Sequence, residues 1–250
     1  MTFEFAISPD VHVRNIADWF VFNTRLQRVT DLSFHATTYD DFSDLHSAYV
    51  EGRVDLVYAN AADTAWLVRE HGFVPIAAPE QVSDEAVIAV AASGGVRSVD
   101  DFGTHLTVAA TDAPDVERIC RILLEPADLG PGDVDLVMQR NYVLVAKAVM
   151  TGATEAGFFL RAAYDELSEV IRSRLHPVVS SRIYVVSHCL LAGPAMAGHH
   201  EQLAKGIKKL SADPASAELL SGLGAPHDWH RMSLEDTEFM IDLMDALGQQ

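Results

Sequence analysis

The sequence predicts an α/β protein of two lobes, with two mixed, mostly parallel sheets joined by a two-strand hinge. Strand-like and helix-like patterns alternate along nearly the whole chain, which favours largely parallel sheets. The segment 52–60, Gly-Arg-Val-Asp-Leu-Val-Tyr-Ala-Asn, has a counterpart at 152–158, Gly-Ala-Thr-Glu-Ala-Gly-Phe. In each, a glycine ends a helix and a short apolar strand then opens into small or polar residues. We therefore expect two lobes of similar construction that hold a ligand between them.

The first lobe begins with a strand at 3–8, followed by Ser-Pro-Asp and an amphipathic helix. In this helix Ile16, Trp19, Phe20 and Leu26 recur near helical spacing. The elements that follow are predicted as a strand at 32–38, a helix from Tyr39, a strand at 54–60, a helix at 61–71 and a strand at 73–79.

The second lobe begins at the β-prone run 86–92, which Gly94 and Gly95 end. Ser98 is a suitable N-cap for a short helix at 98–102. Pro114 suits the start of a helix at 116–125. The other expected elements are strands at 106–110, 133–139 and 156–160, a helix from Tyr142 and a helix at 162–174.

The chain then returns to the first lobe through a long extended run at 176–192. Helices at 198–210, 214–223 and 234–247 are expected to cover that lobe. Lobe one is thus residues 1–84 and 186–250, and lobe two is residues 85–185. Hinge crossings are predicted near 84–90 and 180–187.

The composition indicates a well-packed and strongly acidic protein. Hydrophobic residues make up 49% of the 250 residues, and 36 acidic against 18 basic residues give a net charge of −18. That field repels nucleic acid and anionic lipid, so neither is expected as a partner. An anion site in this chain must depend on local donors such as helix N-termini.

The absence of membrane and export signals in the sequence predicts a cytoplasmic location. No run of about 18 apolar residues is present, so no membrane insertion is expected. Glu4 interrupts the first apolar run, and no basic segment precedes it, unlike a signal peptide. The protein as given is expected in the cytoplasm, or in the periplasm if a leader was removed. Cys120 and Cys189 are expected to be small core residues.

Catalytic, metal and cofactor motifs are absent from the sequence. There is no Gly-x-Ser-x-Gly, no Walker loop, no Gly-x-Gly-x-x-Gly and no His-Glu-x-x-His or Cys-x-x-Cys. His199 and His200 are adjacent on a predicted helix and point about 100 degrees apart, so they are poorly placed to share a metal. His188 and Cys189, within a predicted strand, face opposite sides. We therefore expect that the protein binds neither a metal nor a cofactor and that it is not an enzyme.

In open α/β sheets, ligands bind at the carboxyl ends of the strands, where helix N-termini converge. For Asn60, Thr111, Asp112 and Asn141, capping of the following helix is the competing interpretation. Tyr39 is suited either to stack on a ligand or to cover the edge of the lobe. The full set of candidate ligand-binding residues is Ser8, Asp10, Tyr39, Tyr58, Asn60, Ser93, Thr111, Asp112, Asn141, Tyr142 and Phe158.

The order of these elements resembles type II periplasmic binding proteins, in particular the phosphate/phosphite/phosphonate group of ABC-transporter substrate-binding proteins. The resemblance covers nearly the whole chain, and the order of its motifs carries it. It implies the two-lobed fold of that group, a small-molecule ligand, and an ABC permease or a sensor as partner. The segments that carry it are 52–58, Lys147-Ala-Val-Met-Thr-Gly152 with Glu155-Ala-Gly157, the Ser180-Ser181 crossing, Leu210-Ser-Ala-Asp-Pro214 and Leu219-Leu-Ser-Gly-Leu-Gly224.

Two departures from this family bear on the ligand. The position of the family's Ser/Thr/Gly-rich turn reads Thr111-Asp112-Ala113-Pro114-Asp115. Two carboxylates there disfavour a dianionic phosphoryl group, and Pro114 removes one N–H donor. The position of the family's Ser-His pair reads Asn141-Tyr142.

The function expected is therefore a solute-binding protein that closes by a hinge on a small polar or anionic ligand, for transport or sensing. One alternative is a cytoplasmic enzyme on the same fold, similar to menaquinone-pathway dehydratases or thiamin-pyrimidine synthases. Such an enzyme would need an acid, base or nucleophile among Tyr58, Asp112 and Asn141. The other alternative is the effector-binding domain of a regulator.

Overall fold

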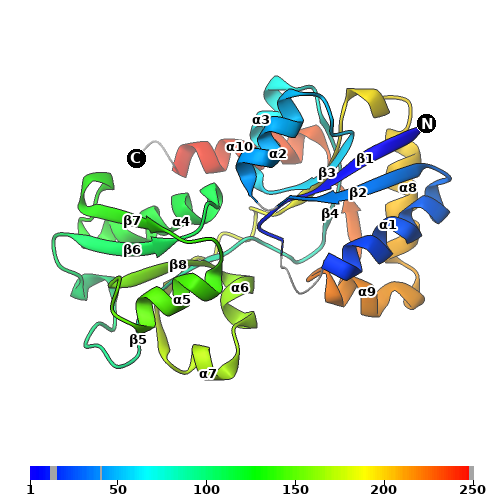
Figure 1. Ribbon diagram of the computed structural model, residues 1–250. Helices are drawn as coiled ribbons and strands as arrows, with labels where there is room; N and C mark the ends of the chain where they lie inside the picture. Colours follow the sequence, from blue (N-terminus) through cyan, green and yellow to red (C-terminus); the bar gives the residue numbers. More distant parts are fainter. Residues whose placement is uncertain (12–15, 40, 248–250) are drawn as a thin grey trace. The chain divides into compact units, whose positions relative to one another are not determined.

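The computed structural model describes residues 1–11, 16–39 and 41–247. The described chain divides into two compact units (Figure 1). Unit 1 is Met1–Ser83 with Val185–Met244, and unit 2 is Asp84–Tyr184 with residues 245–247. Each unit has its own sheet and its own core, and the chain passes between them at 83–84, at 184–185 and, within α10, at 244–245.

Unit 1 is built on a six-stranded sheet in the order β11-β4-β10-β3-β1-β2. Strands β1, β2 and β3 pair in parallel, whereas β10 pairs antiparallel with both β3 and β4, and β11 pairs antiparallel with β4. The strands are β1 (Thr2–Ile7), β2 (Ser33–Thr38), β3 (Leu56–Ala59), β4 (Val74–Pro79), β10 (Cys189–Ala192) and β11 (Trp229–Arg231).

Helices cover both faces of this sheet (Figure 1). Alternate residues of β1, Phe3, Phe5 and Ile7, join the cluster formed with α1 and α8, as period-two alternation requires. The helices of the unit are α1 (Ile16–Thr30), α2 (Phe42–Val50), α3 (Ala61–Glu70), α8 (His200–Ser211), α9 (Ala217–Gly222) and α10 (Leu234–Leu247).

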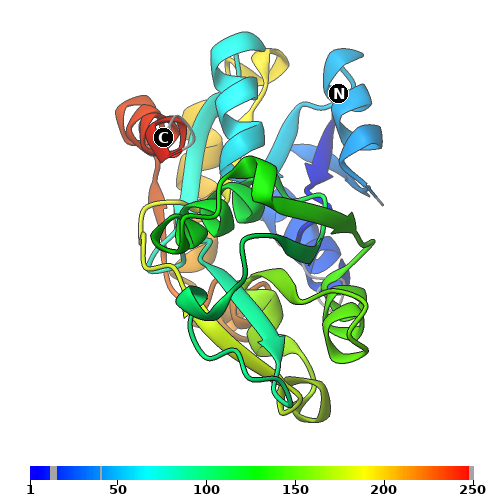
Figure 2. The same cartoon turned by 90° about the vertical axis from the view of Figure 1, so that its left-hand side faces the viewer.

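Unit 2 has a five-stranded sheet in the order β7-β6-β8-β5-β9. Strands β6, β7 and β8 are parallel, while β5 runs antiparallel to both β8 and β9. The β5–β9 pair lies at the lower end of the unit in Figure 2, in teal and yellow-green. The strands are β5 (Ala86–Ala91), β6 (Leu106–Ala110), β7 (Val134–Met138), β8 (Ala156–Leu160) and β9 (Leu175–Ser180).

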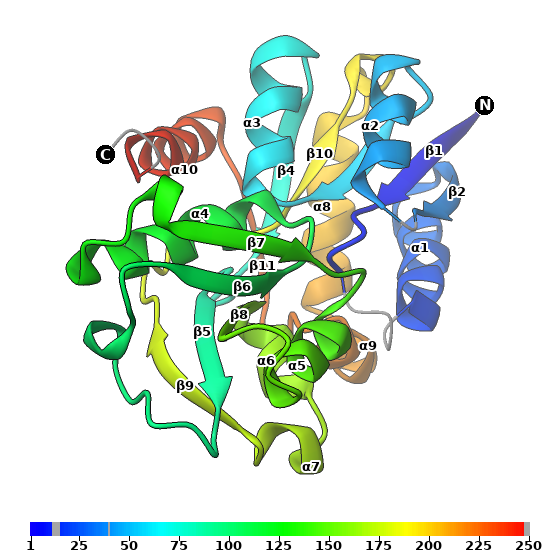
Figure 3. The ribbon, with the colours of Figure 1, turned by 60° about the vertical axis from the view of Figure 1, so that its left-hand side comes forward.

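In unit 2, α4 and α5 lie on opposite sides of the sheet (Figure 3). Val145 and Val149 of α5 pack on Phe159 and Val87, and Gly157 of β8 lets α5 approach closely. The helices of this unit are α4 (Pro114–Leu124), α5 (Tyr142–Met150), α6 (Arg161–Glu166) and α7 (Glu169–Arg172). Short 3-10 turns occur at Val99–Asp101, Glu125–Ala127 and Pro131–Asp133 in unit 2, and at Pro194–Met196 and Pro214–Ser216 in unit 1.

The elements predicted from sequence differ from these in four places. The single helix predicted at 162–174 is two short helices, α6 and α7. The single extended run at 176–192 is two separate strands, β9 and β10, with an irregular segment 181–188 between them. The stretch around Trp229, for which no element was predicted, forms β11. The helix predicted from Tyr39 begins at Phe42, because Asp41 is its N-cap and accepts a hydrogen bond from the Asp44 backbone N–H.

Candidate functional site

At one edge of the unit 1 sheet, three strands bring polar residues together. Ser8 directly follows β1, and Asn60 directly follows the parallel strand β3. Because β10 runs antiparallel to β3, with Cys189 opposite Ala59, the start of β10 lies at the same edge. His188, the residue before β10, therefore lies beside the carboxyl ends of β1 and β3.

The carboxylate of Asp10 is the centre of this group. Its Oδ1 accepts hydrogen bonds from Ser8 Oγ (2.5 Å) and His188 Nε2 (3.0 Å), and its Oδ2 accepts one from Asn60 Nδ2 (3.0 Å). The side chains of Asp10 and His188 are each 8% exposed. We call Ser8, Asp10, Asn60 and His188 the Asp10 network.

Two opposing influences determine the pKa of Asp10. Burial by itself would raise it, because a carboxylate is poorly solvated in the interior. The charge of His188 and the hydrogen bonds from His188, Ser8 and Asn60 outweigh burial and lower the pKa of Asp10 to about 2. Asp10 is therefore ionised at neutral pH, and the donors of the Asp10 network are directed toward it.

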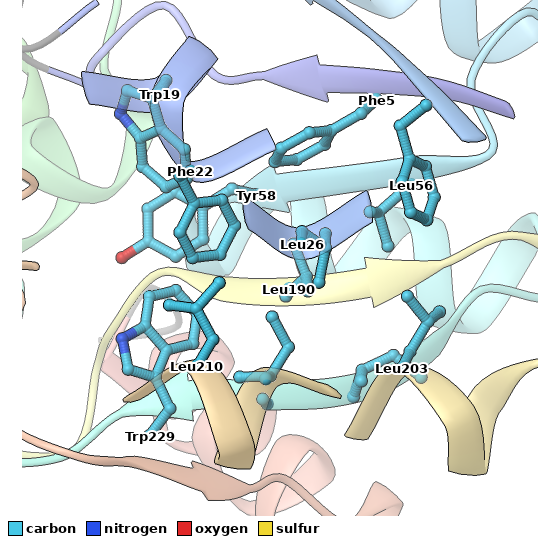
Figure 4. Packing of buried hydrophobic residues seen from close by; sticks show 14 of the residues in the cluster. Phe5, Trp19, Phe22, Leu26, Leu56, Tyr58, Leu190, Leu203, Leu210 and Trp229 are labelled. Atoms are coloured by element: carbon cyan, nitrogen blue, oxygen red, sulfur yellow. The ribbon is translucent and has the colours of Figure 1, made fainter. Parts of the chain in front are cut away.

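Tyr58 is part of a buried aromatic cluster beside this network (Figure 4). Its ring lies 4.7 Å from that of Trp19, 5.7 Å from Trp229 and 5.3 Å from the stacked imidazole of His188, measured between centroids. Figure 4 shows the Tyr58 hydroxyl and the ring nitrogens of Trp19 and Trp229 on the same side of the cluster. These contacts hold the imidazole of His188 in place.

Asn60 and Tyr39 have further contacts inside unit 1. The Oδ1 of Asn60 accepts a hydrogen bond from the Asp63 backbone N–H (2.9 Å), so Asn60 caps α3 as well as donating to Asp10. Tyr39 directly follows β2 and is partly buried. Burial raises the pKa of the Tyr39 hydroxyl; the nearby Arg53 charge opposes that rise and the Glu4 charge adds to it. The Tyr39 hydroxyl therefore lies close to charged groups of its own unit.

In unit 2, the parallel strands β6, β7 and β8 also end at one edge. Thr111 and Asp112 follow β6, Asn141 and Tyr142 come shortly after β7, and Arg161 follows β8. The Oδ1 of Asn141 caps α5 by accepting from the Leu144 backbone N–H (3.0 Å). The guanidinium of Arg161 is half-exposed and donates to Asp165 at 2.7 Å.

The N-terminus of α4 is the part of this edge best suited to an anion. Its N-cap is Ala113, which has no side chain that could cap the helix, so the prediction that Thr111 or Asp112 caps α4 is wrong. The Oγ1 of Thr111 is buried and has no hydrogen-bond partner in the described part of the chain. A helix N-terminus directs N–H groups and a partial positive charge toward its surroundings. Pro114, at the first turn, has no N–H, and the acidic residues Asp115 and Glu117 also lie in this turn. The remaining backbone N–H groups and the Thr111 hydroxyl can together bind a small anion.

Two of the predicted site residues lie away from these edges. Ser93 comes after β5, and because β5 is antiparallel to β8, with Val90 opposite Ala156, it lies at the opposite edge from Thr111. Phe158 lies in the middle of β8 and is fully buried. The strand continues to Leu160, which brings Arg161 to the edge instead.

His188 and Arg161 were missed in the sequence analysis. His188 was interpreted only as a strand residue, since the pairing of β10 with β3 joins segments more than a hundred residues apart. Arg161 directly follows the apolar run 156–160, and applying the strand-end rule to the last residue of that run would have found it.

The part of the chain that the structure describes has neither a metal-binding cluster nor a membrane-spanning helix. The described residues contain no group of three or more His, Cys, Asp or Glu side chains placed to hold a metal ion. Among the helices of residues 16–39 and 41–247, every one is too short or too polar to cross a bilayer.

Comparison with known proteins identifies the family. Residues 5–236 match the model of the family described as "ABC transporter, phosphonate, periplasmic substrate-binding protein". The chain belongs to this phosphonate-binding family. Its members are substrate-binding proteins of ABC transporters and not enzymes, so the predicted solute-binding function is confirmed, and neither the enzyme nor the regulator alternative is favoured. The family implies a small-molecule ligand and a permease partner. No curated protein sequence matches the chain.

Solved structures share the fold of the phosphonate-binding family. PhnD1 from Prochlorococcus marinus, in complex with methylphosphonate, has a TM-score of 0.82 at 12% identity, covering 100% of this chain and 99% of its own. The phosphonate-transporter binding protein PA3383 from Pseudomonas aeruginosa has a TM-score of 0.79 at 13% identity, with 99% and 89% covered. The aliphatic sulphonate binding protein SsuA from Escherichia coli has a TM-score of 0.66 at 13% identity, with 98% and 91% covered. The predicted type II periplasmic-binding-protein fold, with two mixed sheets, is therefore confirmed.

Proposed function

We propose that this protein binds a small oxyanion of the phosphonate or sulfonate class, and that the carboxyl edge of the unit 2 sheet supplies the main anion contacts. The observation that carries this proposal is the N-terminus of α4. It has no side-chain cap, and it follows closely on Thr111, whose buried hydroxyl has no partner among the described residues. Membership of the phosphonate-binding family supports the ligand class. The printed ligand of PhnD1, methylphosphonate, is the natural first probe.

Arg161 supplies a cation at the same edge. It follows β8, the neighbour of β6 in the parallel part of the sheet, and its side chain is half-exposed. Its ion pair with Asp165 at this exposure is a weak interaction, so the guanidinium can turn toward an anion at small cost. A guanidinium binds two oxygens of a phosphonate or sulfonate in a planar, bidentate arrangement.

The acidic residues at this edge bear on the charge of the ligand. Asp112 is exposed and follows Thr111, and the whole protein carries a net charge of −18. A doubly charged group is repelled more strongly than a singly charged one by these carboxylates. We therefore expect a sulfonate, or a phosphonate in its singly charged form, to bind better than a dianion.

The Thr111→Val substitution tests the site. It removes the hydroxyl and keeps the shape, so the affinity for methylphosphonate should fall about tenfold or more, because a hydrogen bond to a charged group is lost. Thr154→Val is the matched control. Thr154 Oγ1 is likewise buried without a partner in the described residues, but it precedes β8 and lies at the amino edge.

Isothermal titration calorimetry with methylphosphonate and methanesulfonate would compare these variants with the unmodified protein. T154V should bind as the unmodified protein does. Equal affinities for T111V and T154V would refute the assignment of Thr111. If neither anion, nor phosphate, phosphite or sulfate, binds the unmodified protein, the ligand class itself is wrong.

The Arg161→Gln substitution should weaken methylphosphonate binding by about tenfold, since a charge-assisted contact is removed. Arg121→Gln is its control, because Arg121 forms the same kind of i,i+4 ion pair, with Glu117 at 2.8 Å, within α4. Binding should be unaffected in R121Q. If both arginine variants lose affinity equally, a general charge effect explains the loss, and Arg161 does not contact the anion.

Delivery of the ligand to an ABC permease is the role we infer within the family, with the periplasm as its place. The sequence predicts a cytoplasmic location for the protein as given, and a sensor as partner would fit that location. Release of the native gene product from host cells by osmotic shock would support the periplasmic role. Retention of all the protein with a cytoplasmic marker enzyme would favour sensing.

A further inference from the structure

Two short connections join the two units, besides α10, in which a third boundary falls after Met244. The first runs from the end of β4 at Pro79 to the start of β5 at Ala86, and the second from Ser180 of β9 to Cys189 of β10. The unit boundaries fall inside them, after Ser83 and after Tyr184. Any rotation of one unit against the other must change backbone torsions within these connections and at the end of α10.

Glu85, in the first connection, binds the second connection through its carboxylate. Both of its oxygens accept from the Ile183 backbone N–H, at 2.8 and 3.0 Å, and Oε1 also accepts from the Tyr184 N–H at 2.7 Å. The hydroxyl of Ser181 donates to Oε2. Ser181 further ties the connections together, because its Oγ accepts from the Ala86 N–H at 2.9 Å.

Each connection contains a residue in the left-handed region of backbone conformation. Tyr184 has φ 60° and Gln81 has φ 58°, and neither is glycine. Residues other than glycine, asparagine and aspartate adopt this backbone conformation rarely, and at a cost in free energy. The Tyr184 ring is 73% exposed, so packing of the ring does not impose the conformation. The hydrogen bond from the Tyr184 N–H to Glu85 is the contact that holds the backbone there.

The far end of the second connection is fixed in unit 1. Val186, Ser187 and His188 are buried, and His188 is bound to Asp10 in the Asp10 network. In the first connection, the backbone N–H of Glu80 donates to the Asp228 carbonyl at 2.8 Å. The residues that are not buried are therefore few: Glu80–Glu85 in the first connection and Arg182–Val185 in the second.

We propose that Glu85 is a positioning residue that holds Ile183 and Tyr184 to unit 2, and thereby confines bending between the units to Gln81–Asp84 and to the Tyr184–Val185 junction. Its main chain also connects to the candidate anion site, because the Arg161 N–H donates to the Glu85 carbonyl at 2.6 Å. Only this last link depends on the proposed function. The positioning itself concerns the chain without ligand.

Glu85→Gln tests the proposal on the full-length protein without ligand. The substitution replaces one acceptor oxygen by an NH₂ donor, which then faces a backbone N–H or the Ser181 hydroxyl. Amide hydrogens of Ile183 and Tyr184 should exchange with solvent about tenfold faster, measured by hydrogen–deuterium exchange. Spin labels at Lys209→Cys in α8 and Glu169→Cys in α7 should show a broader distance distribution by pulsed electron resonance. The native Cys120 and Cys189 are fully buried, which favours labelling at the introduced sites.

Asp101→Asn is the matched control. Asp101 also accepts two backbone N–H bonds in unit 2, from Arg97 at 2.8 Å and Ser98 at 2.9 Å, but it lies outside both connections. D101N should leave the distance distribution unchanged. An unchanged distribution and unchanged exchange in E85Q would overturn the proposal.

Tyr184→Gly keeps the test decisive if E85Q folds poorly. Glycine adopts φ 60° without penalty and keeps the N–H that binds Glu85, but it also opens other torsions at this junction. The distance distribution should therefore broaden. An unchanged distribution in Y184G would show that bending does not occur there. Failure of methylphosphonate to bind would leave both of these measurements unaffected, so the two proposals fail independently.

Discussion

An Asp10→Asn variant should unfold with a free energy about 3 kcal/mol lower than that of the unmodified protein at pH 7, because a buried carboxylate that accepts three hydrogen bonds is removed. Asp10 accepts from Ser8, Asn60 and His188, and its side chain is 8% exposed. The asparagine amide would replace one acceptor oxygen by an NH₂ donor, so one of the three donors would lose its partner in a buried place. Urea unfolding followed by tryptophan fluorescence measures this loss, because Trp19, Trp66 and Trp229 all lie in unit 1.

The same carboxylate predicts how stability depends on pH. The pKa of Asp10 is lowered from 3.8 to about 2 in the folded protein. A lowered folded-state pKa contributes stability above the unfolded pKa, and this contribution is lost as the pH falls through the folded pKa. Between about pH 4 and pH 2 the unmodified protein should therefore lose about 2 kcal/mol that Asp10 contributed, and D10N should not show this part of the loss.

Asp228→Asn is the control for both measurements. Asp228 pairs with Lys208 at 2.8 Å, but the two side chains are 44% and 56% exposed, so the loss should be below about 1 kcal/mol. If D10N were no less stable than D228N, the Asp10 network would not hold the edge of unit 1 together.

A Gly157→Ala variant should destabilise unit 2 by about 2 kcal/mol or more through overpacking. A Cβ at this position would lie 2.8 Å from Phe159 Cε2, 2.8 Å from Val145 Cγ1 and 2.9 Å from Val149 Cγ2. These three side chains are at most 1% exposed, so they have no free space into which to move. Hydrogen exchange of the β8 amides reports on this unit directly, since no tryptophan lies in it.

Gly132→Ala provides the comparison for that variant. A Cβ on Gly132 meets nothing within 4 Å, and the residue is exposed, so its change should stay within about 0.5 kcal/mol. Similar protection of the β8 amides in G157A and G132A would mean that α5 can move away from the sheet, contrary to the close packing described here.

The local parts of this fold could be predicted from sequence because short-range rules govern them. Asn60 and Asn141 each directly precede a predicted helix, a position at which asparagine commonly caps the helix. In the structure both residues form these caps. The residues after β6 and β7 were predicted to lie at one edge of the sheet by another short-range rule, because the carboxyl ends of parallel strands meet at one edge. These rules need only the strand and the residue that follows it.

The parts that depend on strand direction and on distant pairing could not be predicted in this way. Ser93 follows a strand, but β5 is antiparallel to β8, and nothing within the run 86–92 reveals that direction. His188 meets Asp10 only because β10 enters the sheet beside β3. In this pairing Cys189 lies opposite Ala59, and the two residues are 130 positions apart in the chain. Ala113 as the cap of α4 was missed because Thr111 and Asp112 are residue types that commonly cap helices.

The position of β10 has a consequence for the order in which the protein is made. β10 lies between β3 and β4, and its four residues, Cys189–Ala192, are all fully buried. While a ribosome is still synthesising residues 84–184, β3 presents an open edge, and β4 has no strand partner because β10 and β11 both come later. The inserted unit is nearly continuous in sequence and can complete its own sheet first. The N-terminal third of the nascent chain is therefore the stage most exposed to aggregation, and the one for which a chaperone would matter most.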